Sequence, residues 1–207
     1  MKKLFLFFAS ILFFLSTSIV SAFSKESFTT FSFPVRGWDN WSITGQTPLD
    51  VPLFAYEEAS VSSVPITWML RLDAIKDKEI SSRLADLVAT DSSQLLGGLL
   101  EVTPELARQA NATYSDSGSF TSANHLYLSG YSPEDRIKLI DTYMEAFFLR
   151  FGSYPTTVGA DQLDTISLQY LQEHYSVVGV LVEGEKYQSS NLVRWGGSLF
   201  SSYTLYC

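Results

Sequence analysis

The chain has 207 residues, a formal net charge of −8 at pH 7 and 46% hydrophobic residues, which is enough for one domain with a packed core. The acidic balance, without a run of Lys or Arg, argues against nucleic acid or anionic lipid as the main partner, because phosphate binding needs clustered positive charge. The single cysteine, Cys207, excludes a disulfide within the chain.

The N-terminus has the pattern of a secretory signal peptide over residues 1–22. Lys2 and Lys3 precede an almost unbroken apolar run from Leu4 to Leu15, and Val20-Ser21-Ala22 supplies the small residues expected before cleavage. The apolar run is shorter than the roughly 20 residues that span a bilayer. We therefore predict cleavage after Ala22, no stable membrane anchor afterwards, a secreted or cell-envelope location, and one domain over residues 23–207.

The next part of the chain predicts strands followed by helices. Residues 31–35 and 66–70 are short apolar runs that are typical of strands, and Asp77 is expected to cap a helix. Gly97-Gly98 then interrupts the chain before a third predicted strand, Leu99 to Val102. Thr103-Pro104-Glu105 supplies an N-cap, a proline and an acid for the following helix.

The same alternation continues after a polar, Gly- and Ser-rich stretch at 111–130. Ser132-Pro133 begins a predicted helix that ends at Gly152, with its apolar stripe at Ile137, Ile140, Met144, Phe147, Phe148 and Phe151. Residues 157–160 predict a strand, Asp164 is expected to cap a helix through Tyr175, and 177–182 is a continuous apolar run typical of a strand buried on both faces.

Strands that alternate with helices favour an α/β fold with a parallel sheet. Two architectures fit this pattern, an open doubly wound sheet and a closed or irregular (β/α) barrel. No glycine-rich phosphate-binding motif follows any predicted strand, which removes the main argument for a nucleotide-binding open sheet. We therefore predict an irregular (β/α) barrel.

Acidic side chains recur at the carboxyl ends of the predicted strands, where the loops of a parallel barrel converge on a ligand. Two facing carboxylates can divide acid and base roles, and tryptophans can stack on sugar rings. The catalytic candidates are Glu101, Asp161 and Asp39, and the substrate-binding candidates are Arg36, Trp38, Asp73 and Trp195. Helix capping or a place in a polar loop would explain the presence of several of these acids equally well, and core packing would explain the tryptophans. Glu101 differs from the other acids because it lies within an apolar strand run.

Neither metal nor cofactor chemistry is predicted. The histidines are His125 and His174, which lack the spacing of a metal-binding pair, and there is no G-x-S-x-G motif for a serine nucleophile.

Four segments taken in order resemble polysaccharide deacetylase-like (NodB-like) proteins. They are Phe33-Pro34-Val35-Arg36-Gly37, Pro65-Ile66-Thr67-Trp68-Met69-Leu70, Gly98-Leu99-Leu100-Glu101-Val102, and Phe151-Gly152-Ser153-Tyr154-Pro155 running into Val158-Gly159-Ala160. The resemblance implies an irregular seven-stranded (β/α) barrel that removes acetyl groups from amino sugars with a metal held by one aspartate and two histidines. Beyond Val182, the one further strand predicted is Leu199 to Tyr206, so such a barrel would be incomplete at its C-terminus.

The sequence departs from that family where its chemistry resides. Arg36-Gly37-Trp38-Asp39 replaces the paired aspartates, Glu101 stands where the H-x-x-x-H ligands would lie, and Gly159-Ala160-Asp161-Gln162 replaces Arg-x-Pro-Tyr. The metal-dependent reaction therefore cannot be carried over. The sequence predicts an exported carbohydrate-active protein that acts on or binds envelope or environmental polysaccharide, if an enzyme then a hydrolase, or alternatively a non-catalytic binding or scaffold protein that keeps the barrel.

Overall fold

The computed structural model describes residues 30–37, 50, 53, 56–57, 64–114, 126–160 and 162–182, and the backbone of 186–188 and 193–195. The signal-peptide prediction over residues 1–22 lies outside these segments. No helix within them combines the length and apolar character needed to cross a bilayer.

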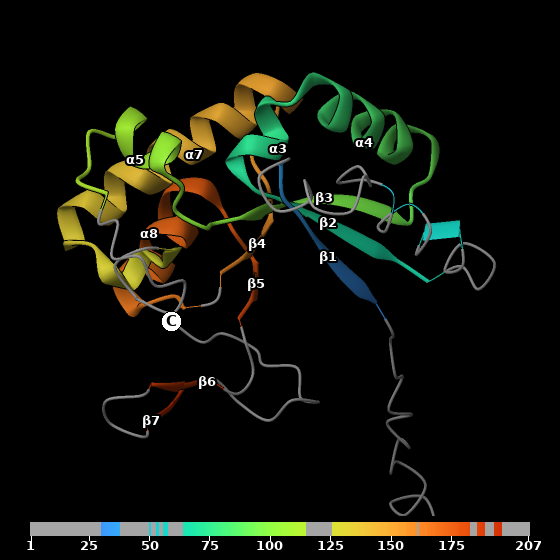
Figure 1. Ribbon diagram of the computed structural model, residues 1–207. Coiled ribbons are helices and arrows are strands. Elements are labelled where there is room, and N and C mark those ends of the chain that lie inside the picture. The colour runs from blue at the N-terminus through green and yellow to red at the C-terminus, as the bar shows by residue number, and fades with distance from the viewer. Residues whose placement is uncertain are drawn as a thin grey trace, which may run out of the picture.

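Five parallel strands form one sheet in which each strand pairs with its neighbours in the chain. They are β1 (Phe31–Val35), β2 (Ile66–Leu70), β3 (Gln94–Leu99), β4 (Thr157–Gly159) and β5 (Gly179–Leu181), in the order β1-β2-β3-β4-β5. This order never reverses, whereas a doubly wound sheet reverses at its switch point. Because parallel crossovers are right-handed, a sequential order places the connecting helices on one face and curls the sheet. The predicted α/β class is confirmed, and the described sheet is a curled half-barrel (Figure 1).

The helices lie together on one side of this sheet (Figure 1). They are α3 (Leu72–Lys76), α4 (Lys78–Thr90), α5 (Pro104–Gln109), the short 3-10 helix η2 (Leu128–Gly130), α7 (Pro133–Phe151) and α8 (Thr165–Tyr175). The core fills the space between the two layers. Val35, Trp68, Leu70 and Val158 enter it from the strands, and Leu84 is one of the fully buried side chains that meet them from the helices.

Local capping signals position the helices as the sequence predicts. Asp77 accepts hydrogen bonds from the backbone N–H groups of α4, and Thr103, Ser132 and Asp164 do the same for α5, α7 and α8. Gly152 ends α7 with φ +76°, a left-handed conformation that glycine adopts without a steric cost.

The apolar stripe of α7 differs from the predicted one. The buried side chains are Leu139, Ile140, Tyr143, Met144 and Phe147, whereas the predicted Phe148 is 43% exposed. The face of α7 that packs on the sheet is thus rotated toward Tyr143. Tyr143 can be buried there because its hydroxyl finds hydrogen-bond partners on the strands beneath it. That hydroxyl donates to the Leu70 carbonyl and accepts from the Leu99 N–H.

The third strand begins earlier than predicted, so its assignment to Leu99 to Val102 is wrong. Gly97 and Gly98 lie inside β3, and Leu100, Glu101 and Val102 follow its end. A Cβ at Gly97 would lie 2.5 Å from Met69 Sδ, and one at Gly98 would lie 3.0 Å from the Tyr143 hydroxyl. These glycines are therefore needed for close approach within the sheet and do not mark a turn.

The last parallel strand is shorter and more exposed than its sequence predicts. β5 covers only Gly179–Leu181, Leu181 is 47% exposed, and Val178 before it is 82% exposed. The prediction of a strand buried on both faces is wrong, because β5 stands at the edge of the described sheet. Two further short strands, β6 (Lys186–Gln188) and β7 (Val193–Trp195), pair antiparallel where no strand was predicted, and Leu199 to Tyr206 lies outside the described residues.

Candidate functional site

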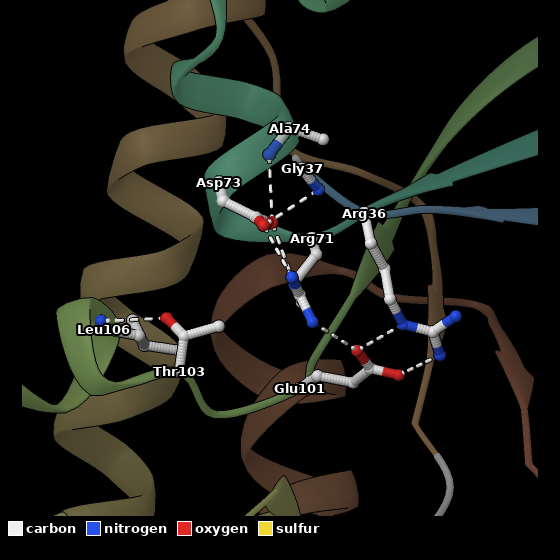
Figure 2. Close-up of polar contacts among 8 residues, drawn as sticks. All are labelled: Arg36, Gly37, Arg71, Asp73, Ala74, Glu101, Thr103 and Leu106. Carbon is white, nitrogen blue, oxygen red and sulfur yellow. Dashed lines mark hydrogen bonds and ion pairs between the residues drawn. The ribbon is translucent and has the colours of Figure 1, made fainter. Parts of the chain in front are cut away.

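Four charged side chains meet at the carboxyl ends of the first three strands (Figure 2). Arg36 directly follows β1, Arg71 directly follows β2, Asp73 lies in the first turn of α3, and Glu101 follows β3. We call these four residues the charge cluster. Parallel pairing in register brings the strand ends to one edge of the sheet, so residues far apart in the chain become neighbours there.

Glu101 lies at the centre of the charge cluster and is 1% exposed. Its Oε2 accepts from Arg36 Nε at 2.7 Å and from Arg71 Nη1 at 3.4 Å, and its Oε1 pairs with Arg36 Nη2. Both carboxylate oxygens are thus engaged by guanidinium groups. A carboxylate so enclosed holds the two arginines side by side.

Asp73 fixes the other end of the charge cluster. Its Oδ1 accepts from Arg71 Nε at 2.8 Å, and its Oδ2 accepts from the Gly37 N–H at 2.8 Å and pairs with Arg71 Nη2. A Cβ at Gly37 would lie 2.4 Å from Asp73 Oδ2, so the absence of a side chain there permits the contact. Asp73 therefore ties the end of β1 to the start of α3.

Tyr143 supports the cluster from the helix layer. Its hydroxyl bridges Leu70 and Leu99, the last residues of β2 and β3, with distances of 2.6 Å to the carbonyl and 3.0 Å to the N–H. Burial raises the pKa of this phenol well above its ordinary value, so the hydroxyl keeps its proton and can donate. The two strand ends that carry Arg71 and Glu101 are thereby held at a fixed separation.

A pocket of about 280 Å³ opens beside Arg36 on the face of the sheet opposite the helices. Side chains alternate along a strand, so Pro34, Met69 and Leu99 point away from the core that Val35 and Leu70 enter. The lining residues are Pro34, Arg36, Met69, Leu99, Gly159, Ala160, Leu181 and Val182. The pocket wall is therefore aliphatic apart from one guanidinium group, whose side chain is 32% exposed.

Three of the predicted site residues, Arg36, Asp73 and Glu101, are brought together in the charge cluster. Trp68 is fully buried and donates from Nε1 to Gln94 Oε1 at 3.1 Å, so this tryptophan belongs to the core and is not available to stack on a sugar ring. The other candidates lie outside the described residues, or in the case of Trp195 have no described side chain; they are Asp39, Asp161, Trp38 and Trp195.

Arg71 and Gly37 are the site residues that the sequence analysis missed. Arg71 is 3% exposed and stands between Leu70 and Leu72, which are fully buried. A basic residue inside an apolar run is the same signal that singled out Glu101, because a buried charge needs a partner of opposite sign. Applying that argument to both residues would have predicted that they pair.

Within the described segments, no group of three or more His, Cys, Asp or Glu side chains could hold a metal ion. The fold and the charge cluster together define a β/α half-barrel with an ion-paired network at the carboxyl ends of its strands. No family model matches this chain, and no curated protein matches it.

Proposed function

We propose that this chain is an exported carbohydrate-binding protein that keeps a deacetylase-like β/α barrel as a scaffold without its hydrolytic chemistry. The ligand binds at the carboxyl ends of the strands, over the pocket beside Arg36. Arg36 contacts the ligand, and Glu101 acts as a positioning residue for that guanidinium group.

The enclosure of Glu101 is the observation that carries this proposal. A general acid or nucleophile must come within hydrogen-bond reach of the substrate. Glu101 is 1% exposed, and Arg36 and Arg71 occupy its oxygens. This arrangement suits a carboxylate that holds other groups in place, and it favours binding over hydrolysis as the function of the site.

The position of the pocket also supports ligand binding. Ligand sites of parallel β/α folds gather at the carboxyl ends of the strands, and binding pockets are mostly apolar with a few placed polar groups. The pocket lining described above fits that composition, with Arg36 as its charged side chain. The acidic balance of the whole chain is compatible with a glycan and unfavourable for a polyphosphate.

The test is a binding and activity assay on the full chain with named oligosaccharides. The panel contains cellohexaose, maltohexaose, laminarihexaose, xylohexaose, hexagalacturonate and chitosan hexamer, with binding measured by calorimetry and with release of acetate or new reducing ends measured from the matching polysaccharides. We expect saturable binding of at least one oligosaccharide, weakened at least about tenfold by Arg36→Met, and no turnover.

Arg108→Met is the matched control, because Arg108 lies on the exposed surface of α5 and pairs with Glu105. It removes the same charge without touching the pocket, so binding should be unchanged. Absence of binding across the panel would overturn the proposal. Product release that Glu101→Gln abolishes would instead establish the hydrolase, with Glu101, Asp161 and Asp39 as its candidate acids.

A further inference from the structure

A series of aromatic rings crosses the helix layer at α7, the turn after it, and α8. The distances between neighbouring ring centroids are 5.0 Å for Phe148 and Tyr154, 5.0 Å for Tyr154 and Tyr175, 6.2 Å for Tyr175 and Tyr170, and 4.1 Å for Tyr170 and His174. We call these five residues the aromatic strip. None of them lines the pocket beside Arg36, so the strip is a separate surface.

The aromatic strip is partly open to solvent. Phe148 and Tyr154 are 43% and 42% exposed, and His174 is exposed as well. Gly152 ends α7 in a left-handed conformation, and the chain turns back so that Tyr154 lies against Phe148 on the last turn of the helix. Aromatic rings that form a contiguous, accessible series mark a surface on which another molecule binds.

Asp141 on α7 fixes two rings of the strip. Its Oδ1 accepts hydrogen bonds from the Tyr170 hydroxyl at 2.8 Å and from the Tyr175 hydroxyl at 2.6 Å. Burial, and then the contact with Asp141, raise the pKa of both phenols, so both keep the protons that they donate. No described residue bonds to Asp141 Oδ2, which is not a buried atom and remains available to a further donor.

Carboxylates without a cationic partner border the strip. Asp141 and Glu145 lie one turn apart on the same face of α7, and Glu173 is exposed on α8 in the same helical turn as two rings of the strip. Among the described residues, none of these three carboxylates has an ion-paired Lys or Arg. The nearest cations along α7 are engaged elsewhere, because Lys138 pairs within its own helix and Arg150 donates to serine hydroxyls of α4.

Rings and carboxylates together recognise organic cations. A guanidinium or ammonium group is attracted to the face of an aromatic ring and forms charge-assisted hydrogen bonds with a carboxylate. Alternate side chains of an extended peptide point to the same side at a spacing of about 6.6 Å. This spacing is close to the 5.0–6.2 Å between neighbouring rings from Phe148 to Tyr170, so successive cations of such a peptide can meet successive rings.

We propose that the aromatic strip, together with Asp141, Glu145 and Glu173, is a docking surface for a basic segment of another protein. The segment binds in an extended conformation, with Arg or Lys side chains at alternate positions against the rings and carboxylates. Charge complementarity defines this partner, and the net charge of −8 on the whole chain adds a long-range attraction for it. The proposal does not depend on the proposed function, because the strip and the pocket share no residue.

The first test measures peptide binding to the full chain by calorimetry. The probe is a six-residue peptide in which arginine alternates with serine, and its neutral match carries citrulline in place of each arginine. We expect saturable binding of the arginine peptide and binding at least about tenfold weaker for the citrulline peptide, which has the same shape without the charge. No binding of the arginine peptide, or equal binding of both peptides, would overturn the proposal.

The second test locates the binding on the strip. Tyr154→Leu keeps an apolar side chain but removes the ring, and should weaken binding of the arginine peptide at least about threefold, whereas Tyr154→Phe keeps the ring and should bind as the wild type does. Combining Tyr154→Leu with Glu145→Gln should weaken binding at least about tenfold. Both positions are exposed, and thermal unfolding checks that the variants fold.

Glu79→Gln is the matched control, because Glu79 is an exposed glutamate on α4 and its loss changes the net charge of the protein equally. It should leave peptide binding unchanged. Peptide binding that is unchanged in the Tyr154→Leu and Glu145→Gln double variant would show diffuse attraction to an acidic protein and overturn the proposal. Loss of cellohexaose binding in Tyr154→Leu with peptide binding intact would instead make the strip a sugar platform, and would overturn it as well.

Discussion

Each end of the parallel sheet has a buried polar network, and the two networks are built from different chemistry. At the carboxyl end, four ionised side chains join the ends of β1, β2 and β3. At the amino end, Gln94 is 1% exposed and joins Trp68 to a turn by uncharged groups, with Asp91 as the acid among the described contacts.

The amino-end network is mostly local. Asp91 accepts from the backbone N–H and hydroxyl of Ser93 at 2.9 and 2.7 Å, and Gln94 Nε2 donates to Asp91 at 3.2 Å. Tyr56 adds a longer contact at 3.3 Å. This network holds the turn that precedes β3, and the contacts described for it include no cation.

Within the described residues, the comparison shows that an Arg–carboxylate ion pair is not required to close an end of this sheet. Burying charges costs several kcal/mol per ion before pairing, and ion pairs are often no more stabilising than apolar replacements. A cluster of four charges next to a pocket, with Glu101 and Arg71 buried, is therefore poorly explained by stability alone. A fixed guanidinium group beside the pocket, as the proposed function requires, is a better explanation.

The largest expected effect comes from breaking the central ion pair. Glu101→Ala should lower the free energy of unfolding by about 3–5 kcal/mol, because it removes the buried carboxylate that pairs with both Arg36 and Arg71 and leaves the charge cluster with two guanidinium groups and one carboxylate. At the other end, Gln94→Ala should cost about 1–3 kcal/mol, since it leaves Trp68 Nε1 without its acceptor. Urea unfolding of both variants measures the difference, and an equal or larger loss in Gln94→Ala would contradict the contrast between the two ends.

A smaller effect is expected from crowding the Asp73 contact. Gly37→Ala places a methyl group where Asp73 Oδ2 lies, and should cost about 1–3 kcal/mol by urea unfolding. In an Asp73→Ala background the same substitution should cost less, with a coupling energy of about 0.5–3 kcal/mol. Identical costs in both backgrounds would show that Asp73 is not the group being displaced.

The smallest effect concerns acid stability at the amino end. Hydrogen bonds from the Ser93 side chain and then its backbone N–H hold the pKa of the Asp91 carboxyl below its usual value. The resulting stabilisation is present above the pKa of the unfolded chain and is lost as the pH falls through the lower folded pKa. Stability curves of wild type and Asp91→Asn should therefore differ at neutral pH and converge in acid, and curves that remain parallel would contradict this assignment.

The parts of the fold that the sequence predicts are those with local signals. Asp77, Thr103, Ser132 and Asp164 cap the helices that they were expected to cap, because capping depends on a side chain and backbone two or three residues away. The bounds of β3 could not be predicted in this way. Gly97 is needed there because Met69 and Thr157 crowd it from neighbouring strands, which is a contact over long sequence separation.

In the candidate site, too, the features that follow from local sequence could be predicted and those that depend on long-range packing could not. The position of Arg36, Asp73 and Glu101 at one edge could be predicted, since strand ends in a parallel sheet converge. Their roles could not, because the extent to which Glu101 is buried depends on how closely the strand ends approach one another. Sequence reasoning treated Glu101 as an accessible acid, whereas in the structure it is a buried anchor for arginines.

The Tyr143 hydroxyl also makes the ends of β2 and β3 depend on the docking of α7. It takes the place of a neighbouring strand as the hydrogen-bond partner of the Leu99 amide and the Leu70 carbonyl. Protection of that amide from hydrogen exchange therefore depends on α7 remaining docked, so loosening of the helix and fraying of the two strand ends form one cooperative opening event. The rigidity of the strand ends beside the pocket is in this sense set by a helix on the opposite face of the sheet.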